Sequence, residues 1–180
     1  EAASWDMEAI RKSAAVAARE ARAAGIQLTY APMVDVSRDP RWGRILEAAG
    51  EDPYLNARVA EARVRGFQES GADKSENLLA TVKHYAAYGA ALAGRDYNIR
   101  DVSERELREV HLPPFKAAID AGVSSVMTAY TAYDGVPATA STFLMLDVLR
   151  GELGFDGLLM TDWETIPNLV ETGVAATEDE

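Results

Sequence analysis

Carboxylate, cationic and aromatic side chains stand at the ends of the apolar runs of this sequence. Asp162 and Trp163 directly follow one run, and Lys83 and His84 end another. An ionised aspartate at the end of a buried strand can act as a nucleophile, a base or a metal ligand. Trp163 offers a flat apolar face of the kind that covers a sugar ring. The structural alternative for Asp162 is the cap of a following helix.

Lys83 and His84 allow a second kind of chemistry. Successive strand residues point to opposite faces, so both can reach one ligand only if the chain bulges, turns or adopts a strained peptide there. Together they could hydrogen-bond several hydroxyl groups, or a buried Lys83 could form a Schiff base with a carbonyl substrate. The structural alternative is a lysine paired with a carboxylate and a core histidine. The other histidine, His111, falls in a predicted helix and is expected to be structural.

The loop at residues 37–44 contains three arginines and an aspartate around a turn. Such clusters often only fix a loop through internal ion pairs. The functional alternative is one guanidinium that reaches the site as a fork for a ligand. Composition alone does not select among Arg38, Arg41 and Arg44. Tyr130 ends a further apolar run, where its phenol could contact Asp162 or fill the core.

Apolar runs and amphipathic segments alternate along the chain. The pattern predicts strands at residues 26–34, 78–83, 123–130 and 157–161 and helices at residues 4–24, 54–69, 103–121 and 142–153. Ser4 is the expected cap of the first helix, and Pro113 and Pro114 should kink or split the third. Because the strands are apolar and scarcely alternate, we expect them to be parallel and buried on both faces, in an α/β fold.

An open doubly wound sheet and a β/α barrel both fit this alternation. The long loops follow strands, at residues 35–52, 84–102, 131–140 and from 162 onward, and a barrel concentrates its chemistry on that face. A GxGxxG fingerprint or P-loop is absent. About four βα units are half of the eight that a closed barrel needs. We therefore expect a partial (β/α)8 TIM-type barrel, excerpted from a larger chain that covers the open sheet edges.

The composition of the chain excludes or disfavours several classes of partner and cofactor. With 180 residues, 48% of them hydrophobic, the chain can form a packed core. The 29 acidic against 18 basic residues give a formal charge of -11, which disfavours nucleic acid and anionic membranes. No cysteines and only two histidines leave little for a transition metal, so we expect no metal and no cofactor. Cytoplasmic, periplasmic and secreted locations all stay open, because any signal peptide would lie upstream of Glu1.

Taken together, these segments resemble glycoside hydrolase family 3, the group that contains many bacterial β-glucosidases and β-xylosidases. Five ordered motifs carry the resemblance over nearly the whole chain: APMVDVSRDPRWGRILEAAGEDPYL from Ala31, TVKHYAAYG from Thr81, GRDYNIRDVSERELREVHLPPFKAAIDAG from Gly94, VMTAY from Val126 and GFDGLLMTDW from Gly154. The resemblance implies that residues 1–180 form one segment of the N-terminal catalytic barrel domain of that family.

The resemblance also implies an activity. It matches Asp162 to the catalytic nucleophile of a retaining exo-β-glycosidase, which hydrolyses terminal β-D-glycosides through a covalent glycosyl-aspartyl intermediate. Arg44, Lys83 and His84 match ligands for sugar hydroxyls, and Tyr130 matches a tyrosine close to the nucleophile. The general acid/base would be a glutamate from a following domain. A further carboxylate for the sugar would come from upstream, so the expected partners are a small or oligomeric β-glycoside and the remainder of the chain.

Two departures from the family pattern bear on specificity. Thr161 stands where serine is common before the nucleophile, which keeps the hydroxyl. The loop at residues 85–89 lacks the histidine and aspartate typical of the family's N-acetylglucosaminidases, which disfavours β-N-acetylhexosaminidase specificity. β-Xylosidase specificity, an inactive sugar-binding fragment without the acid/base, and a Schiff-base lyase using Lys83 are the alternatives.

Overall fold

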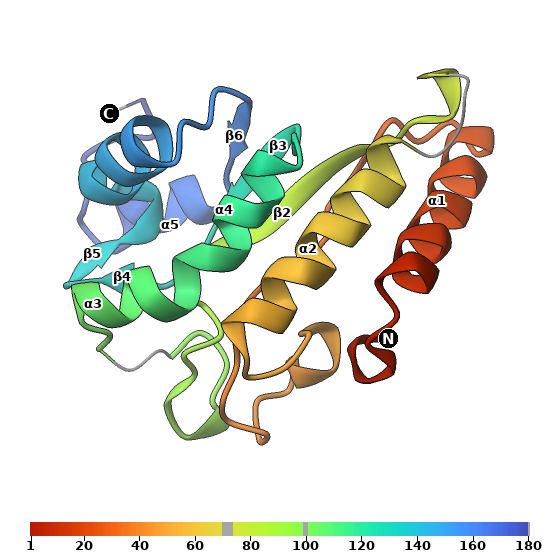
Figure 1. The fold of residues 1–180 in the computed structure, drawn as a ribbon. Helices are drawn as coiled ribbons and strands as arrows, with labels where there is room; N and C mark the ends of the chain where they lie inside the picture. The colour runs from red at the N-terminus through yellow and green to blue at the C-terminus, as the bar shows by residue number, and fades with distance from the viewer. Residues whose placement is uncertain (70–73, 99–100, 180) are drawn as a thin grey trace.

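The computed structural model describes residues 1–69, 74–98 and 101–179. Within them, four parallel strands form one sheet in the order β1-β2-β3-β6 (Figure 1). The strands are β1 (Leu28–Thr29), β2 (Leu79–Tyr85), β3 (Ser125–Thr128) and β6 (Leu158–Met160). An antiparallel pair that the sequence did not predict, β4 (Ala132–Tyr133) and β5 (Val136–Pro137), lies in the loop after β3. The parallel sheet confirms the α/β class.

Helices connect the strands as the alternation predicts. The α- and π-helical segments are α1 (Met7–Ala23), α2 (Pro53–Gln68), α3 (Glu104–Glu106), a π-helical turn (Leu107–His111), α4 (Leu112–Asp120), a π-helix (Phe143–Glu152) and α5 (Thr165–Glu171). Short 3-10 turns are Ala2–Ser4, Ile45–Glu47, Lys74–Glu76, Leu92–Gly94 and Ala138–Ala140. Figure 1 shows α2 and α4 lying side by side across one face of the sheet, with α1 beside α2. No helix in these described ranges has the length and apolarity of a membrane span.

Two sequence predictions about these elements are wrong in detail. The cap of α1 is Asp6 rather than Ser4, because the Asp6 carboxylate accepts a hydrogen bond from the main-chain N–H of Ala9 at 2.9 Å. The first strand is much shorter than residues 26–34: β1 pairs with β2 only at Leu28–Thr29, and a single bridge follows at Met33. Pro32 has no N–H to donate to a ladder, which interrupts the pairing.

The prolines of the third helix act as expected. Pro113 and Pro114 lie in the first turn of α4, directly after the π-helical turn Leu107–His111. Proline supplies no N–H for the preceding turn, so the helix widens there before it continues to Asp120. The predicted helix at residues 142–153 is present but π-helical, a distinction that its residue pattern does not encode.

The core lies between the sheet and the helices that cover it. Val82 of β2 and Val126 of β3 are fully buried, as are Phe115 of α4 and Leu144 of the π-helix. Tyr85 ends β2, packs edge-on against Phe115 at 5.1 Å and donates its hydroxyl hydrogen to the main-chain oxygen of Leu144 at 3.0 Å. These contacts fix the end of β2, from which the neighbouring residue His84 enters the site.

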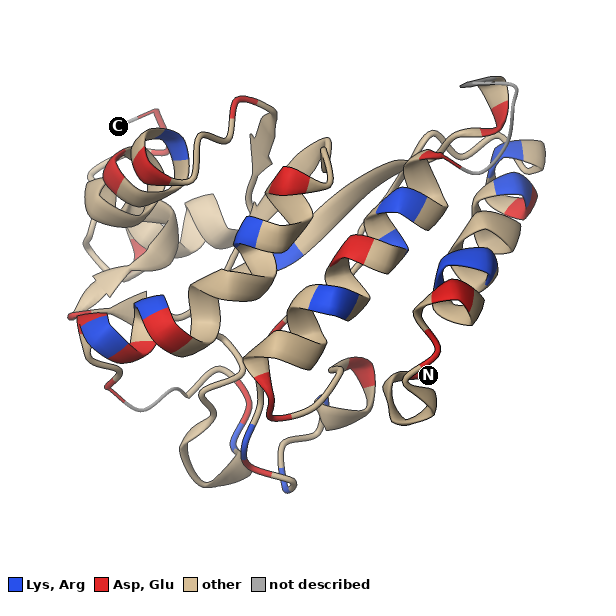
Figure 2. Cartoon of the chain, viewed as in Figure 1, with Lys and Arg blue, Asp and Glu red and all other residues tan. Residues whose placement is uncertain are grey.

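Charged residues cover the outer helices. Figure 2 shows acidic and basic residues interleaved along α1, α2 and α4. They form short-range pairs such as Arg58 with Glu61 and Lys116 with Asp120. Exposed pairs of this kind contribute little to stability, and we interpret these faces as solvated surface.

Candidate active site

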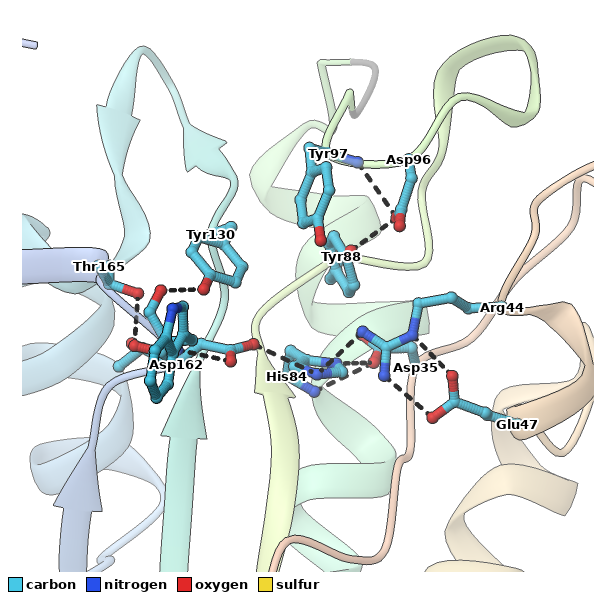
Figure 3. A network of polar contacts seen from close by, with 12 residues as sticks. Asp35, Arg44, Glu47, His84, Tyr88, Asp96, Tyr97, Tyr130, Asp162 and Thr165 are labelled. Carbon is cyan, nitrogen blue, oxygen red and sulfur yellow. Dashed lines mark hydrogen bonds and ion pairs between the residues drawn. The ribbon is translucent and has the colours of Figure 1, made fainter. Parts of the chain in front are cut away.

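The site is centred on His84, at the end of β2. The register between β2 and β3 shifts after Val82, so the expected departure from a regular strand is present. The His84 side chain is only 2% exposed. Its Nε2 atom lies 3.5 Å from Oδ2 of Asp162 (Figure 3). The structure therefore brings together two residues that are 78 positions apart in the chain (84 and 162).

Asp162 follows β6, and the parallel order β2-β3-β6 places it on the same edge of the sheet as His84. Its Oδ1 accepts the main-chain N–H of Trp163 at 2.7 Å, and its main-chain oxygen accepts the hydroxyl hydrogen of Thr165 at 2.9 Å. Oδ2 points toward His84 (Figure 3). The cap of α5 is Glu164, not Asp162, so the alternative of a purely capping aspartate is wrong.

The structure selects Arg44 from the three arginines of its loop. Its Nε and Nη2 atoms donate to the Glu47 carboxylate at 2.7 and 2.9 Å, and Nη1 lies 3.3 Å from Nε2 of His84. These hydrogen bonds raise the pKa of Arg44 and lower that of Glu47. Arg41 instead pairs with its neighbour Asp39, and Arg38 lies 3.9 Å from Glu106. Arg44 is thus a fixed charge at the mouth of the site.

Lys83 is half-buried beside this group. Burial lowers the pKa of its ammonium group, and the positive charge of Arg44 lowers it further, while Glu47 and Asp162 act in the opposite direction. Lys83 is therefore a cation that loses its proton at a lower pH than an exposed lysine does.

Tyr130 and Trp163 form an aromatic side of the site. The Tyr130 hydroxyl donates to the main-chain oxygen of Trp163, and its ring meets Tyr97 edge-on at 5.4 Å. Burial raises the pKa of Tyr130, and the charge of Asp162 adds to the effect. Trp163 is 77% exposed. These three aromatic residues line a pocket of about 430 Å³ together with Pro137, Glu164, Thr165, Asn168, Leu169 and Thr172. Tyr130 therefore lies against the Asp162 segment rather than in the core.

Asp35 is a residue that the sequence reasoning missed. It is 2% exposed, and its Oδ2 accepts the main-chain N–H of His84 at 3.0 Å and lies 2.9 Å from His84 Nδ1. The available signal was the one that pointed to Asp162, a carboxylate directly after an apolar run.

Asp96 and Tyr88 were missed as well, and they join two loops behind Arg44. Asp96 accepts the Tyr88 hydroxyl at 2.6 Å and the indole N–H of Trp42 at 2.9 Å. Burial raises the pKa of Asp96, but these hydrogen bonds outweigh it and leave the pKa below its usual range. The Tyr88 ring lies under the Arg44 guanidinium at 5.6 Å. The sequence pattern does not show which polar side chains will be hydrogen-bonded to each other in the folded chain.

The assembled groups suit a polyhydroxylated ligand. The cationic donors and the aromatic wall suit the hydroxyl groups and the apolar face of a sugar, and the Asp162 carboxylate can stabilise a developing positive charge. Across the described ranges, no set of three or more histidine, aspartate or glutamate side chains is arranged to hold a metal ion.

Comparison with known proteins identifies the family of this chain. Residues 2–179 match the family model described as "Glycosyl hydrolase family 3 N terminal domain". The chain belongs to glycosyl hydrolase family 3. It is 42% identical to the periplasmic beta-glucosidase of Salmonella typhimurium over 179 residues, 99% of this chain and 23% of that protein. It is 45% identical to a beta-xylosidase of Formosa agariphila over 165 residues, 89% of this chain and 23% of that protein.

A solved structure of a similar protein has the same fold as this chain. The beta-glucosidase of Listeria innocua in complex with laminaribiose superposes with a TM-score of 0.93 at 46% identity, covering 98% of this chain and 25% of that one. The chain thus spans about a quarter of the length of these relatives. The sheet and its helices are part of a TIM barrel, as the loop pattern predicted.

Proposed function

We propose that this chain carries the nucleophile of a retaining, exo-acting β-glycosidase, and that the nucleophile is Asp162. The observation that carries the proposal is the position of Asp162 Oδ2 at the strand-exit edge, 3.5 Å from His84 Nε2, the atom that also lies 3.3 Å from Arg44 Nη1. The names of the relatives, beta-glucosidase and beta-xylosidase, support the reaction class.

In the first step, Asp162 Oδ2 attacks the anomeric carbon of the terminal sugar. A bond forms between that oxygen and C1, the glycosidic C–O bond breaks, and the departing oxygen takes a proton from a general acid. In the second step, the conjugate base of the general acid takes a proton from water, and the water oxygen attacks C1 from the face opposite Asp162. The bond between C1 and Asp162 Oδ2 breaks, the carboxylate is regenerated, and the sugar leaves with its configuration retained. Arg44, Lys83 and His84 hold the ring hydroxyls, and these contacts strengthen as positive charge develops on the ring.

The general acid is proposed to come from outside these 180 residues. A retaining enzyme places its second carboxyl group about 5 to 5.5 Å from the nucleophile. Asp35 lies behind His84, and Glu47 is held by Arg44, so neither is free to protonate a leaving group. We therefore propose that this chain is one segment of a barrel domain. The remainder of the protein supplies further strands and a second domain with a catalytic glutamate.

Glucosides are the proposed substrate class. The Listeria innocua enzyme has been solved in complex with laminaribiose, as an aspartate-to-alanine mutant, and in complex with glucose, which favours a β-linked glucoside here. The aromatic pocket of Tyr97, Tyr130 and Trp163 beside the nucleophile would receive the leaving group. β-Xylosides are the second choice, because the Formosa agariphila relative is named a beta-xylosidase.

The proposal is tested with Asp162→Ala in the full-length enzyme. Loss of the nucleophile should lower kcat/KM for an aryl β-glucoside by about a thousandfold or more. Azide, which fits the vacated space, should restore turnover and give the α-glycosyl azide. The matched control is Asp156→Ala, an exposed aspartate just before β6, which should keep wild-type rates. Full activity in Asp162→Asn, or a β-glycosyl azide as product, would rule out this nucleophile.

A second candidate function is sugar binding without turnover by the 180-residue chain alone. It is favoured by the share of the relatives that the chain covers, about a quarter. Calorimetry with glucose should then show binding, while the chain leaves an aryl β-glucoside intact. Steady hydrolysis by the isolated chain would exclude this candidate.

A further inference from the structure

The Asp35 carboxylate makes both of its described hydrogen-bond contacts with a single residue. Its Oδ2 meets the main-chain N–H of His84 at 3.0 Å and the ring Nδ1 at 2.9 Å, and Oδ1 has no hydrogen-bond partner in the described part of the chain. Both side chains are almost fully buried, at 1% and 2% exposure. A buried carboxylate directed at one imidazole suggests a role exerted through that imidazole.

The contacts on the two sides of the His84 ring define one tautomer. An ionised carboxylate has no hydrogen to donate, so the Nδ1 atom that faces Asp35 must carry the proton. Nε2 makes its hydrogen-bond contact with Arg44 Nη1 at 3.3 Å, and Asp162 Oδ2 lies farther away, at 3.5 Å. Because a guanidinium has only donors, we infer that Nε2 presents its lone pair to Arg44. The charged and titratable groups around the ring are Asp35, Arg44, Glu47, Lys83, Tyr88 and Asp162.

We propose that Asp35 is a positioning residue that holds His84 as the neutral Nδ1–H tautomer, so that Nε2 presents its single lone pair as an acceptor, to Arg44 in this structure and to a sugar hydroxyl when a ligand is bound. This inference rests on the proposed glycosidase function and names how the site is prepared for it. The main-chain hydrogen bond to the same oxygen fixes the carboxylate relative to the ring, so the ring cannot turn without losing its partner.

The tautomer also determines whether Asp162 Oδ2 faces a hydrogen atom or a lone pair on His84 Nε2. With Nε2 unprotonated, no hydrogen lies between Nε2 and Asp162 Oδ2, 3.5 Å apart, and the oxygen stays available for attack on C1. In the other tautomer, an N–H at Nε2 would face the N–H of Arg44 or would bind Asp162 Oδ2. Either result impairs the site. In the first, the N–H groups of His84 and Arg44 repel each other, and in the second, a hydrogen bond ties up the oxygen of Asp162 that attacks C1.

The kinetic test is a double-mutant cycle in the full-length enzyme. Asp35→Asn preserves volume but can donate to Nδ1, and it should lower kcat/KM at least about tenfold. In a His84→Gln background the same change should alter kcat/KM by less than about twofold, because the residue through which Asp35 acts is gone. Asp120→Asn, an exposed carboxylate paired with Lys116 on α4, is the control and should keep wild-type rates. Equal losses in both backgrounds would show a merely structural role and overturn the proposal.

The spectroscopic test reads the tautomer of His84 directly, without measuring turnover. In the enzyme labelled with ¹⁵N-histidine, the His84 signals, assigned by their loss in His84→Gln, should show a protonated Nδ1 and an unprotonated Nε2 at neutral pH. Asp35→Asn should raise the Nε2–H population. A wild-type ring protonated at Nε2, or a tautomer unchanged by Asp35→Asn, contradicts the proposal. The spectrum does not depend on turnover, so its failure is distinguishable from a failure of Asp162 as the nucleophile.

Discussion

Arg44 has all three guanidinium nitrogens engaged. Nε and Nη2 contact the Glu47 carboxylate, Nη1 contacts His84, and the planar group lies over the Tyr88 ring. Only a planar fork can make these contacts at once, so the residue type matters beyond its charge. The side chain is therefore fixed before a ligand arrives, which lowers the entropy lost on binding.

Arg44→Lys should accordingly weaken substrate binding although it keeps the charge. We expect KM for an aryl β-glucoside to rise about tenfold or more, with a smaller fall in kcat, in steady-state kinetics of the full-length enzyme. Arg41→Lys is the matched control, because Arg41 is exposed and pairs only with Asp39 among the contacts described. Equal effects of the two substitutions would mean that Arg44 acts only as a point charge.

The lowered pKa of Lys83 predicts that sugar binding depends on pH. Because burial and the charge of Arg44 lower its pKa, the ammonium group loses its proton at a lower pH than an ordinary lysine. Affinity for neutral glucose should be constant below that pKa and fall as the pH rises through it. Lys83→Arg should abolish this alkaline fall, since arginine stays charged, whereas Lys116→Arg on the outer face of α4 should leave it unchanged. Calorimetric titrations with glucose across the alkaline range measure the affinity of both variants. If the alkaline fall in affinity persists in Lys83→Arg, another group causes it.

At the scale of elements, the sequence predicted which segments meet but not how their polar partners are arranged. Asp162 and His84 were identified because each ends an apolar run. Arg44 could not be separated from Arg41 by composition, because their difference lies in the 3-10 turn that joins Arg44 to Glu47. Asp35 follows the apolar run at residues 26–34, but its contact with His84 joins positions 49 residues apart, which the pattern along the chain does not report. Periodicity reports which face is buried, and it does not report hydrogen-bond partners.

The packing of α1 on α2 depends on Gly66. A Cβ at this position would lie 2.4 Å from the main-chain oxygen of Arg11 and 2.6 Å from Cβ of Ala14. Alanine favours a helix over glycine by about 1 kcal/mol, but a clash with backbone costs about 1 to 3 kcal/mol, so the clash should win. Gly66→Ala should therefore lower the free energy of unfolding by about 1 kcal/mol or more in urea titrations. Gly43→Ala, which meets open space, should change it by less than about 0.5 kcal/mol; a neutral Gly66→Ala would show that the helices separate freely.

At the scale of the whole molecule, β1 and β6 are the outer strands, and each has one edge without a partner strand among the described residues. Such edges template pairing with other chains unless they are covered. The 180-residue chain alone should therefore self-associate in light scattering at micromolar concentration. Leu158→Lys, on β6 at 53% exposure, should reduce this, whereas Leu146→Lys, on the π-helix at 59% exposure, should not. A monomeric wild-type chain, or equal effects of both changes, would contradict edge pairing.

The most direct measurement of the central proposal is covalent trapping in the full-length enzyme. A 2-deoxy-2-fluoro-β-glucoside with a good leaving group slows both steps and should leave the sugar attached to the nucleophile. Digestion and mass mapping of the labelled enzyme should place the added mass on Asp162. A label on any other residue would contradict the assignment of Asp162 as the nucleophile.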